Sequence, residues 1–178
     1  LNSNKDWGDL PVQVSGLCNE YFLVTGAGKY LRNIELAPER NLGFIQLDDT
    51  AERYRILWGF EPAGAPTSEL AAHLLSHQVI KESTGNRDHA VIHTHASNLI
   101  ALTNAVEDLS TSSLSNLLWK MHAECVVVFP QGIAFIPWMM AGSKEIAMVT
   151  ADALKTCPLV LWQYHGIVGT GRNLDEAF

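Results

Sequence analysis

The chain has 178 residues, of which 47% are hydrophobic, so it is long and apolar enough for one domain with a buried core and not for a disordered segment. Its net charge of −7, without a run of lysine or arginine, argues against nucleic acid and against an acidic membrane surface as partners. Three widely spaced cysteines predict free thiols and a cytoplasmic location. Residues 1–16 predict an irregular lead-in without a signal peptide, and no apolar run reaches the about eighteen residues of a membrane span.

The N-terminal part of the chain has the pattern of β-strands joined by turns. Residues 21–25 are rich in β-forming side chains, and Gly26 and Gly28 follow in a turn that lets a ligand approach the backbone. Such a turn also joins ordinary strands, so both interpretations stay open. Residues 42–47 and 53–59 flank a polar loop, which predicts an antiparallel hairpin and a sheet that is not wholly parallel.

A helix is predicted over residues 70–82, because apolar side chains recur there on one face. Thr67 or Ser68 suits its N-cap, and Glu69 lies where the helix dipole favours negative charge. Many glutamates only stabilise a helix start, so a structural and a catalytic role for Glu69 both remain open. The hydroxyl groups and the amides at this helix start are also donors that a phosphate group could use.

Two histidines stand one residue apart where the predicted strand at residues 90–95 ends. Alternate side chains of a strand share a face, so His93 and His95 can reach one metal ion at about 2.0–2.1 Å each. His165 follows another apolar stretch further along the chain. Three imidazoles with the carboxylate of Glu69 would form a zinc-type site that keeps a coordination position open for substrate.

Other metal arrangements are weaker. His73 and His77 lie four residues apart on the predicted helix, but no third ligand is evident near them. A purely structural zinc would use four strong protein ligands, and the three remote histidines instead favour an open position.

The second half of the chain alternates helical and apolar segments. Glu124 precedes an apolar run, where an acidic residue is by default a simple edge charge. The pattern also predicts a turn at residues 169–171. Helices are predicted at residues 96–106, 114–122, 143–155 and from residue 174, and strands at residues 125–130, at 132–137 as its partner, and at 159–164.

Short motifs follow one another in order from about residue 21. They are TGAGK (25–29), ILWG (56–59), PTSEL (66–70), HTHA (93–96) with NLIALT (98–103), ECVVVFP (124–130), and HG (165–166) before LDE (174–176). In this order they resemble the class II aldolase/adducin family over nearly the whole chain. Agreement across many motifs is far more specific than a histidine pair alone.

The resemblance implies an α/β fold of three layers, α/β/α, with a central, largely antiparallel sheet flanked by helices. Residues 1–178 would form a single domain that lacks the N-terminal segment and the C-terminal helix and tail of the family. Nothing in residues 1–20 matches the Asn/Gly-rich phosphate loop expected of members, and Ala27 stands where close relatives carry serine.

The resemblance also assigns roles to residues. It implies one Zn²⁺ per subunit on His93, His95 and His165. Glu69 would work beside the metal as a catalytic group, and Glu124 would act in the active site of a neighbouring subunit. Substrate phosphate would be bound by Thr67, Ser68, Gly26 and Gly28.

Within the family, the likeness is greatest to members that cleave L-rhamnulose 1-phosphate reversibly to dihydroxyacetone phosphate and L-lactaldehyde in rhamnose breakdown. Such members are lyases that form homotetramers with active sites near subunit interfaces. A related sugar-phosphate aldolase, or a pentulose-phosphate 4-epimerase with the same three histidines, is the alternative. A non-catalytic, adducin-like interaction module is a weaker one, since modules of that kind have lost the metal histidines.

Overall fold

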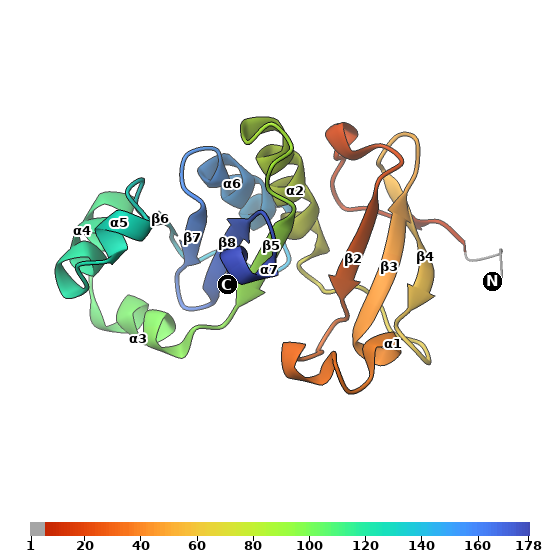
Figure 1. Ribbon diagram of the computed structural model, residues 1–178, viewed down its shortest axis with the longest axis horizontal. Helices are drawn as coiled ribbons and strands as arrows, with labels where there is room; N and C mark the ends of the chain where they lie inside the picture. The colour runs from red at the N-terminus through yellow and green to blue at the C-terminus, as the bar shows by residue number, and fades with distance from the viewer. Residues whose placement is uncertain (1–5) are drawn as a thin grey trace. The chain divides into compact units, whose positions relative to one another are not determined.

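A computed structural model describes residues 6–178 (Figure 1). The chain divides into two compact units, Leu1–Leu74 and Leu75–Phe178, and each is described by itself. The lead-in predicted for residues 1–16 lies partly outside the described residues. That residues 1–178 form a single domain stays a prediction.

Four antiparallel strands form the sheet of the first unit: β1 (Gly8–Asp9), β2 (Tyr21–Thr25), β3 (Leu42–Leu47) and β4 (Arg53–Gly59). Their order in the sheet is β1-β4-β3-β2, and β3 and β4 are the predicted hairpin. Alternation along β3 buries Ile45 and Leu47 and exposes Phe44, as expected for a strand with one face on the core. Short helical segments complete the unit: η1 (Ser15–Leu17), η2 (Leu31–Asn33) and α1 (Pro38–Asn41).

One carboxylate organises the loop of this hairpin. Asp48 is buried and accepts hydrogen bonds from the backbone N–H groups of Glu52 and Arg53 and from the hydroxyl of Thr50. The Arg53 guanidinium donates to its second oxygen at 2.8 Å. These donors lower the pKa of Asp48 to about 2, because they favour its charged form over the cost of its burial.

The second unit has its own sheet of four strands: β5 (Ala90–Thr94), β6 (Ala134–Ile136), β7 (Leu159–Trp162) and β8 (Gly166–Gly171). The order is β5-β8-β7-β6, with β8 antiparallel to both neighbours and β6 parallel to β7. Figure 1 shows β5, β8 and β7 side by side. The end of β5 therefore lies next to the turn between β7 and β8.

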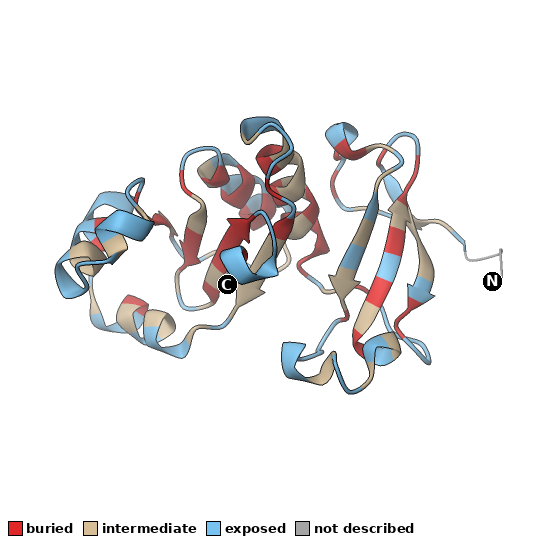
Figure 2. Cartoon of the chain, in the orientation of Figure 1, coloured by how far each residue is buried: buried red, intermediate tan, exposed pale blue. Residues whose placement is uncertain are grey.

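Helices pack around this second sheet. Figure 2 shows buried residues concentrated on β7, β8 and α6, whereas α4 and α5 are largely exposed. A small apolar cluster of Leu114, Ile133 and Leu161 joins α4 to the sheet. The helices are α3 (Ser97–Ala105), α4 (Thr111–Met121), α5 (Cys125–Val128), α6 (Lys144–Leu154) and α7 (Leu174–Ala177), while α2 (Leu70–Ser83) runs across the boundary between the two units in sequence.

The α/β class and the predominance of antiparallel pairing are confirmed, and the strands lie in two sheets of four. Most predicted helices are present within a few residues of the expected bounds. None of the helices in residues 6–178 combines the length and the apolar character that a membrane-spanning segment needs.

The predicted strand at residues 125–130 is wrong. Cys125–Val128 forms the short helix α5, closed by hydrogen bonds from Val127 and Val128 to the carbonyl of Glu124. Valine favours strands when its side chain packs on a pleated, half-buried surface, and here Val127 and Val128 are exposed. The partner predicted for it, β6, pairs instead with β7 in parallel.

The predicted turn at residues 169–171 is also wrong, because these residues belong to β8. The glycines serve packing here. A side chain at Gly169 or Gly171 would come within 2.5 and 2.7 Å of backbone atoms of Ala177 in α7. Their hydrogen side chains let this last helix lie directly on the strand.

Candidate metal centre and active-site residues

The three histidines singled out by the sequence come together in the second unit. His93 lies on β5, His95 just beyond its end, and His165 in the turn between β7 and β8. Their candidate ligand nitrogens all lie within 4.8 Å of one another. Within residues 6–178, this is the one set of three or more histidine, cysteine or acidic side chains close enough to share an ion. The strand pairing that places β5 beside β8 produces this convergence.

Gly166 makes the close approach possible. A Cβ atom at this position would lie 2.5 Å from the carbonyl oxygen of Thr94, 3.1 Å from Cε1 of His93 and 3.2 Å from Cδ2 of His95. The glycine therefore provides the space in which β8 begins against the two histidine rings.

Hydrogen bonding and burial prepare the imidazoles for a metal. Nδ1 of His93 lies 3.2 Å from the carbonyl oxygen of Ile167, and because a carbonyl only accepts, Nδ1 carries the proton and Nε2 keeps its lone pair. Burial, and then repulsion from His95, lower the pKa of His165 and favour the neutral ring that binds metals. Three imidazoles whose ligand nitrogens converge in this way fit a divalent metal ion.

Glu69 lies in the first unit, directly before α2. Its side chain is buried, and its backbone N–H donates to Oγ1 of Thr67 at 3.3 Å. Its carbonyl accepts from the N–H of His73, so Glu69 forms the start of the helix as the sequence predicted. Thr67 therefore orders the segment just before the helix.

The two segments predicted to bind phosphate lie side by side in the first unit. One is the glycine turn after β2, and the other leads into α2. Three backbone contacts join them: a bridge between Gly26 and Pro66, and hydrogen bonds from Ala27 to Ala65 (3.0 Å) and from Thr67 to Thr25 (2.9 Å).

Some donors in these segments are already used within the fold. The N–H of Gly26 donates to the carbonyl of Asn41. The N–H groups of Gly28 and Ser68 make no hydrogen bond to another described residue, and Gly28 adopts φ +67° with open space around it. These two amides and the hydroxyls of Thr67 and Ser68 are the donors left for an anion.

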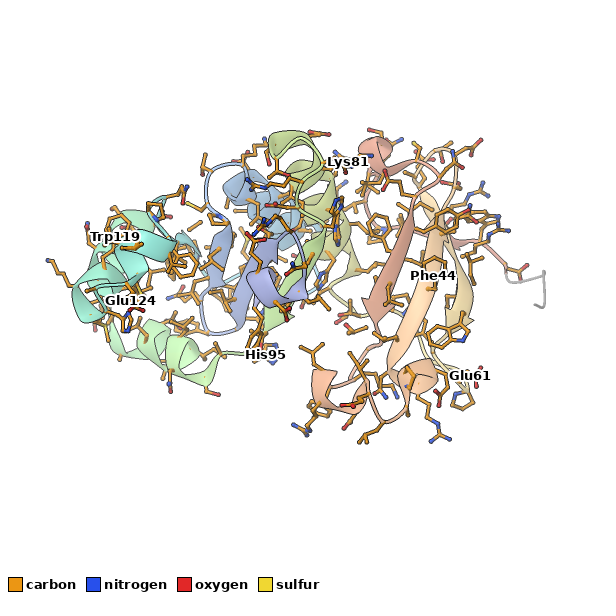
Figure 3. All side chains as sticks on the ribbon, viewed as in Figure 1. Phe44, Glu61, Lys81, His95, Trp119 and Glu124 are labelled. Carbon is orange, nitrogen blue, oxygen red and sulfur yellow. The ribbon has the colours of Figure 1, made fainter. Side chains whose placement is uncertain are left out.

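Glu124 lies elsewhere in the second unit. It is exposed and stands at the N-terminus of α5. Figure 3 shows it beside α4 and α5, apart from His95 at the end of β5. A role in a neighbouring subunit therefore stays a prediction.

The family model described as "Class II Aldolase and Adducin N-terminal domain" matches residues 7–178. The chain belongs to this family. Class II aldolases are metal-dependent, and the three histidines give this member a possible metal site.

Relatives within the class II aldolase and adducin family are similar over most of the chain. A rhamnulose-1-phosphate aldolase of Mannheimia succiniciproducens is 45% identical over 170 residues, which cover 96% of this chain and 62% of that protein. One from Klebsiella pneumoniae is 46% identical, with coverages of 91% and 58%. The chain thus spans about three fifths of the length of these relatives.

Solved structures show the same family fold. The crystal structure of a sugar-phosphate aldolase from Thermotoga maritima superposes with a TM-score of 0.77 at 29% identity, covering 98% of this chain and 69% of that one. YgbL from Escherichia coli, a putative aldolase/epimerase/decarboxylase, gives a TM-score of 0.64 at 24% identity, covering 91% and 72%, and supports the fold alone.

Sequence reasoning missed two residues beside the histidines of this class II aldolase family member. Trp162 is buried against two of the rings, and the carbonyl of Ile167 orients His93. A tryptophan three positions before a candidate ligand is a weak signal, because it is typical of any apolar strand. The contact depends on how β5, β7 and β8 are paired.

Proposed function

We propose that this chain is the core of a metal-dependent aldolase that cleaves L-rhamnulose 1-phosphate reversibly to dihydroxyacetone phosphate and L-lactaldehyde. The convergence of His93, His95 and His165 within 4.8 Å carries the proposal. Family membership supports the reaction class, and the rhamnulose-1-phosphate aldolases that are 45–47% identical support the substrate.

We assign the metal as one Zn²⁺ per subunit. Nε2 of His93 would be one ligand atom, since its Nδ1 faces the carbonyl of Ile167, and His95 and His165 would supply the other two. A bound divalent ion is a Lewis acid that stabilises negative charge on the ketone oxygen of the substrate.

Two carboxylates would move the protons of the reaction. Glu124 of a neighbouring subunit would accept the hydroxyl proton on the aldehyde side, so that this oxygen becomes a carbonyl as the carbon–carbon bond breaks. The bonding electrons stay with the carbon next to the ketone, and Glu69 would deliver a proton there to complete dihydroxyacetone phosphate. The reverse reaction takes the same protons back.

Substrate phosphate would be bound in the first unit. The hydroxyls of Thr67 and Ser68 and the amides of Gly28 and Ser68 are neutral donors that suit a phosphate group in an acidic chain. Gly26 would contribute close backbone approach. Replacing both hydroxyl residues by alanine should mainly raise KM for a phosphorylated substrate.

Assembly and location complete the proposal. A homotetramer would let Glu124 reach a neighbouring site and would make catalysis depend on assembly. The cysteines Cys18, Cys125 and Cys157 are free in the structure, which supports a cytoplasmic protein.

Metal content and substrate turnover test the proposal together. The full-length protein should contain about one zinc per chain, and His93→Ala should lose most of it. His89→Ala, a change to an exposed histidine outside the triad, is the control and should keep the metal. Glu69→Gln should keep the metal and lose most turnover.

A related sugar-phosphate aldolase is the second candidate, supported by the Thermotoga maritima structure. A panel of ketose 1-phosphates that differ in hydroxyl stereochemistry separates the two. We expect the highest kcat/KM for L-rhamnulose 1-phosphate. A clear preference for another ketose, or only 4-epimerisation of pentulose phosphates, would overturn the substrate assignment. Metal retained in full by His93→Ala would overturn the site.

A further inference from the structure

A tryptophan that sequence reasoning missed contacts two of the three histidines. Trp162 ends β7 and is only 1% exposed. Its ring centroid lies 4.7 Å from that of His93 and 5.0 Å from that of His165, with both pairs tilted by 35°. The indole is therefore one buried surface against which both imidazoles lie, although they come from different segments of the chain.

The orientation of this indole is itself fixed. Its Nε1–H donates to Oγ1 of Thr150 at 2.8 Å, and Thr150 is fully buried on α6. Burying an indole N–H is unfavourable unless it is hydrogen-bonded, so a rotation of the ring would leave this donor unsatisfied. A hydrogen bond to a helix that carries no histidine thus locks the ring plane.

The indole adds a second restraint on His93. The bond from Nδ1 to the carbonyl of Ile167 sets which nitrogen is protonated, and the indole face lies against the ring of His93 and opposes a change of its plane. His165 lies in a turn rather than on a strand, and the same indole limits its ring rotation. His95, by contrast, is exposed.

We infer that Trp162, held by Thr150, is a positioning residue that sets the ring orientations of His93 and His165 for metal binding. Neither residue contacts the substrate in this role. The inference depends on the metal site of the proposed function. Metal affinity and coordination geometry, rather than packing alone, are therefore the properties that must change when the hydrogen bond is lost.

The test removes the hydrogen bond and leaves the shape of the core. Thr150→Val keeps the side-chain shape without the hydroxyl, Thr150→Ser restores the acceptor, and Trp162→Phe removes the N–H with part of the ring. Trp119→Phe is the matched control, because its indole N–H donates to the carbonyl of Phe129, away from the histidines.

Two readouts do not depend on turnover. The first is the Zn²⁺ dissociation constant of the metal-free full-length protein, measured by competition with a chelating dye. The second is the visible spectrum of the Co²⁺ form, which reports ligand geometry. Thr150→Val and Trp162→Phe should weaken Zn²⁺ binding about 10-fold or more, as is typical when a group that orients a ligand is lost. Both should also change the Co²⁺ bands, while Thr150→Ser and Trp119→Phe should resemble the wild type.

The outcomes separate the two levels of the argument. Wild-type affinity and spectrum in folded Thr150→Val would overturn the positioning role and leave the metal site intact. A loss that Thr150→Ser does not restore would also overturn it. If Thr150→Val does not fold, the same two readouts on Trp162→Phe decide. If the His93→Ala variant binds metal as tightly as the wild type, the proposed function itself is overturned.

Discussion

At the scale of single residues, Gly166 is a position where one added methyl group should disturb both the fold and the histidine cluster. The methyl group of Gly166→Ala would collide with the carbonyl of Thr94 and press on His93 and His95. We expect a loss of about 1–3 kcal/mol in the free energy of unfolding, as for other overpacked sites, together with loss of bound metal. Urea unfolding and metal analysis measure the two effects.

Gly8→Ala is the control for this change. Gly8 also lies on a strand, and the nearest atoms to a Cβ there belong to the side chain of Tyr54, at 3.3 Å or more. This variant should keep its metal. Full metal content and wild-type stability in Gly166→Ala would show that β5 and β8 can separate without cost to the histidine cluster.

His73 should make the fold sensitive to mild acid. Burial lowers the pKa of His73 to about 4, below the value of about 6.5 expected in the unfolded chain. Between these values the unfolded state binds the proton more readily, so stability falls as pH drops from 6.5 towards 4. Below pH 4 both states are protonated, and this residue causes no further loss.

Replacing this histidine should remove that part of the pH dependence. We compare metal-free proteins with chelator present. As the pH drops from 7 to 4.5, the free energy of unfolding of the wild type should fall by about 2 kcal/mol more than that of His73→Gln. Urea midpoints at the two pH values measure the difference. Parallel stability curves would mean that His73 is accessible to protons in the folded state.

At the scale of elements, the sequence predicted best where periodicity and turn chemistry agree. The hairpin of β3 and β4 follows from two alternating runs around a polar loop, and α2 follows from its apolar face. Prediction failed at α5 and β8, where valines are exposed and glycines pack against a helix. Burial and close approach are set by the tertiary fold, so local pattern could not reveal them.

The hairpin loop offers a test at this scale. Asp48→Ala removes the acceptor for two backbone amides, a hydroxyl and the Arg53 side chain, so the hydrogen bonds that order the loop are lost. We expect a clearly lower urea midpoint at pH 7. Asp49→Ala, the change to its exposed neighbour, should leave the midpoint nearly unchanged. Equal effects of the two substitutions would mean that overall charge, rather than these hydrogen bonds, matters.

At the scale of the whole molecule, the proposed roles are divided between the two units. Thr67, Ser68 and Glu69 belong to the first unit, and the histidine triad belongs to the second. The triad could be predicted, because strand ends are where α/β folds place ligands and because the motifs agree with the family. The positioning role proposed for Trp162 could not be predicted from spacing, since it depends on surfaces that meet only after folding. The cross-subunit role of Glu124 is implied by the family resemblance alone and stays a prediction.

Mixing two inactive variants tests the division of the site between subunits. If Glu69 and Glu124 of different chains serve one site, refolding equal amounts of Glu69→Gln and Glu124→Ala subunits together regenerates sites with both carboxylates. In a closed ring with random placement, about one site in four is intact, so activity should recover to about a quarter of wild type. Mass spectrometry of the assemblies verifies that mixed oligomers form.

The matched control mixes Glu69→Gln subunits with His93→Ala subunits. We assign Glu69 and His93 of any one active site to the same chain. No mixed oligomer of these two restores an intact site, because each chain lacks one of the two groups. Recovery in this control would place Glu69 and His93 in different subunits. No recovery in verified Glu69→Gln and Glu124→Ala oligomers would place both carboxylates in one subunit or remove Glu124 from the reaction, and in either case catalysis would not require a neighbouring chain.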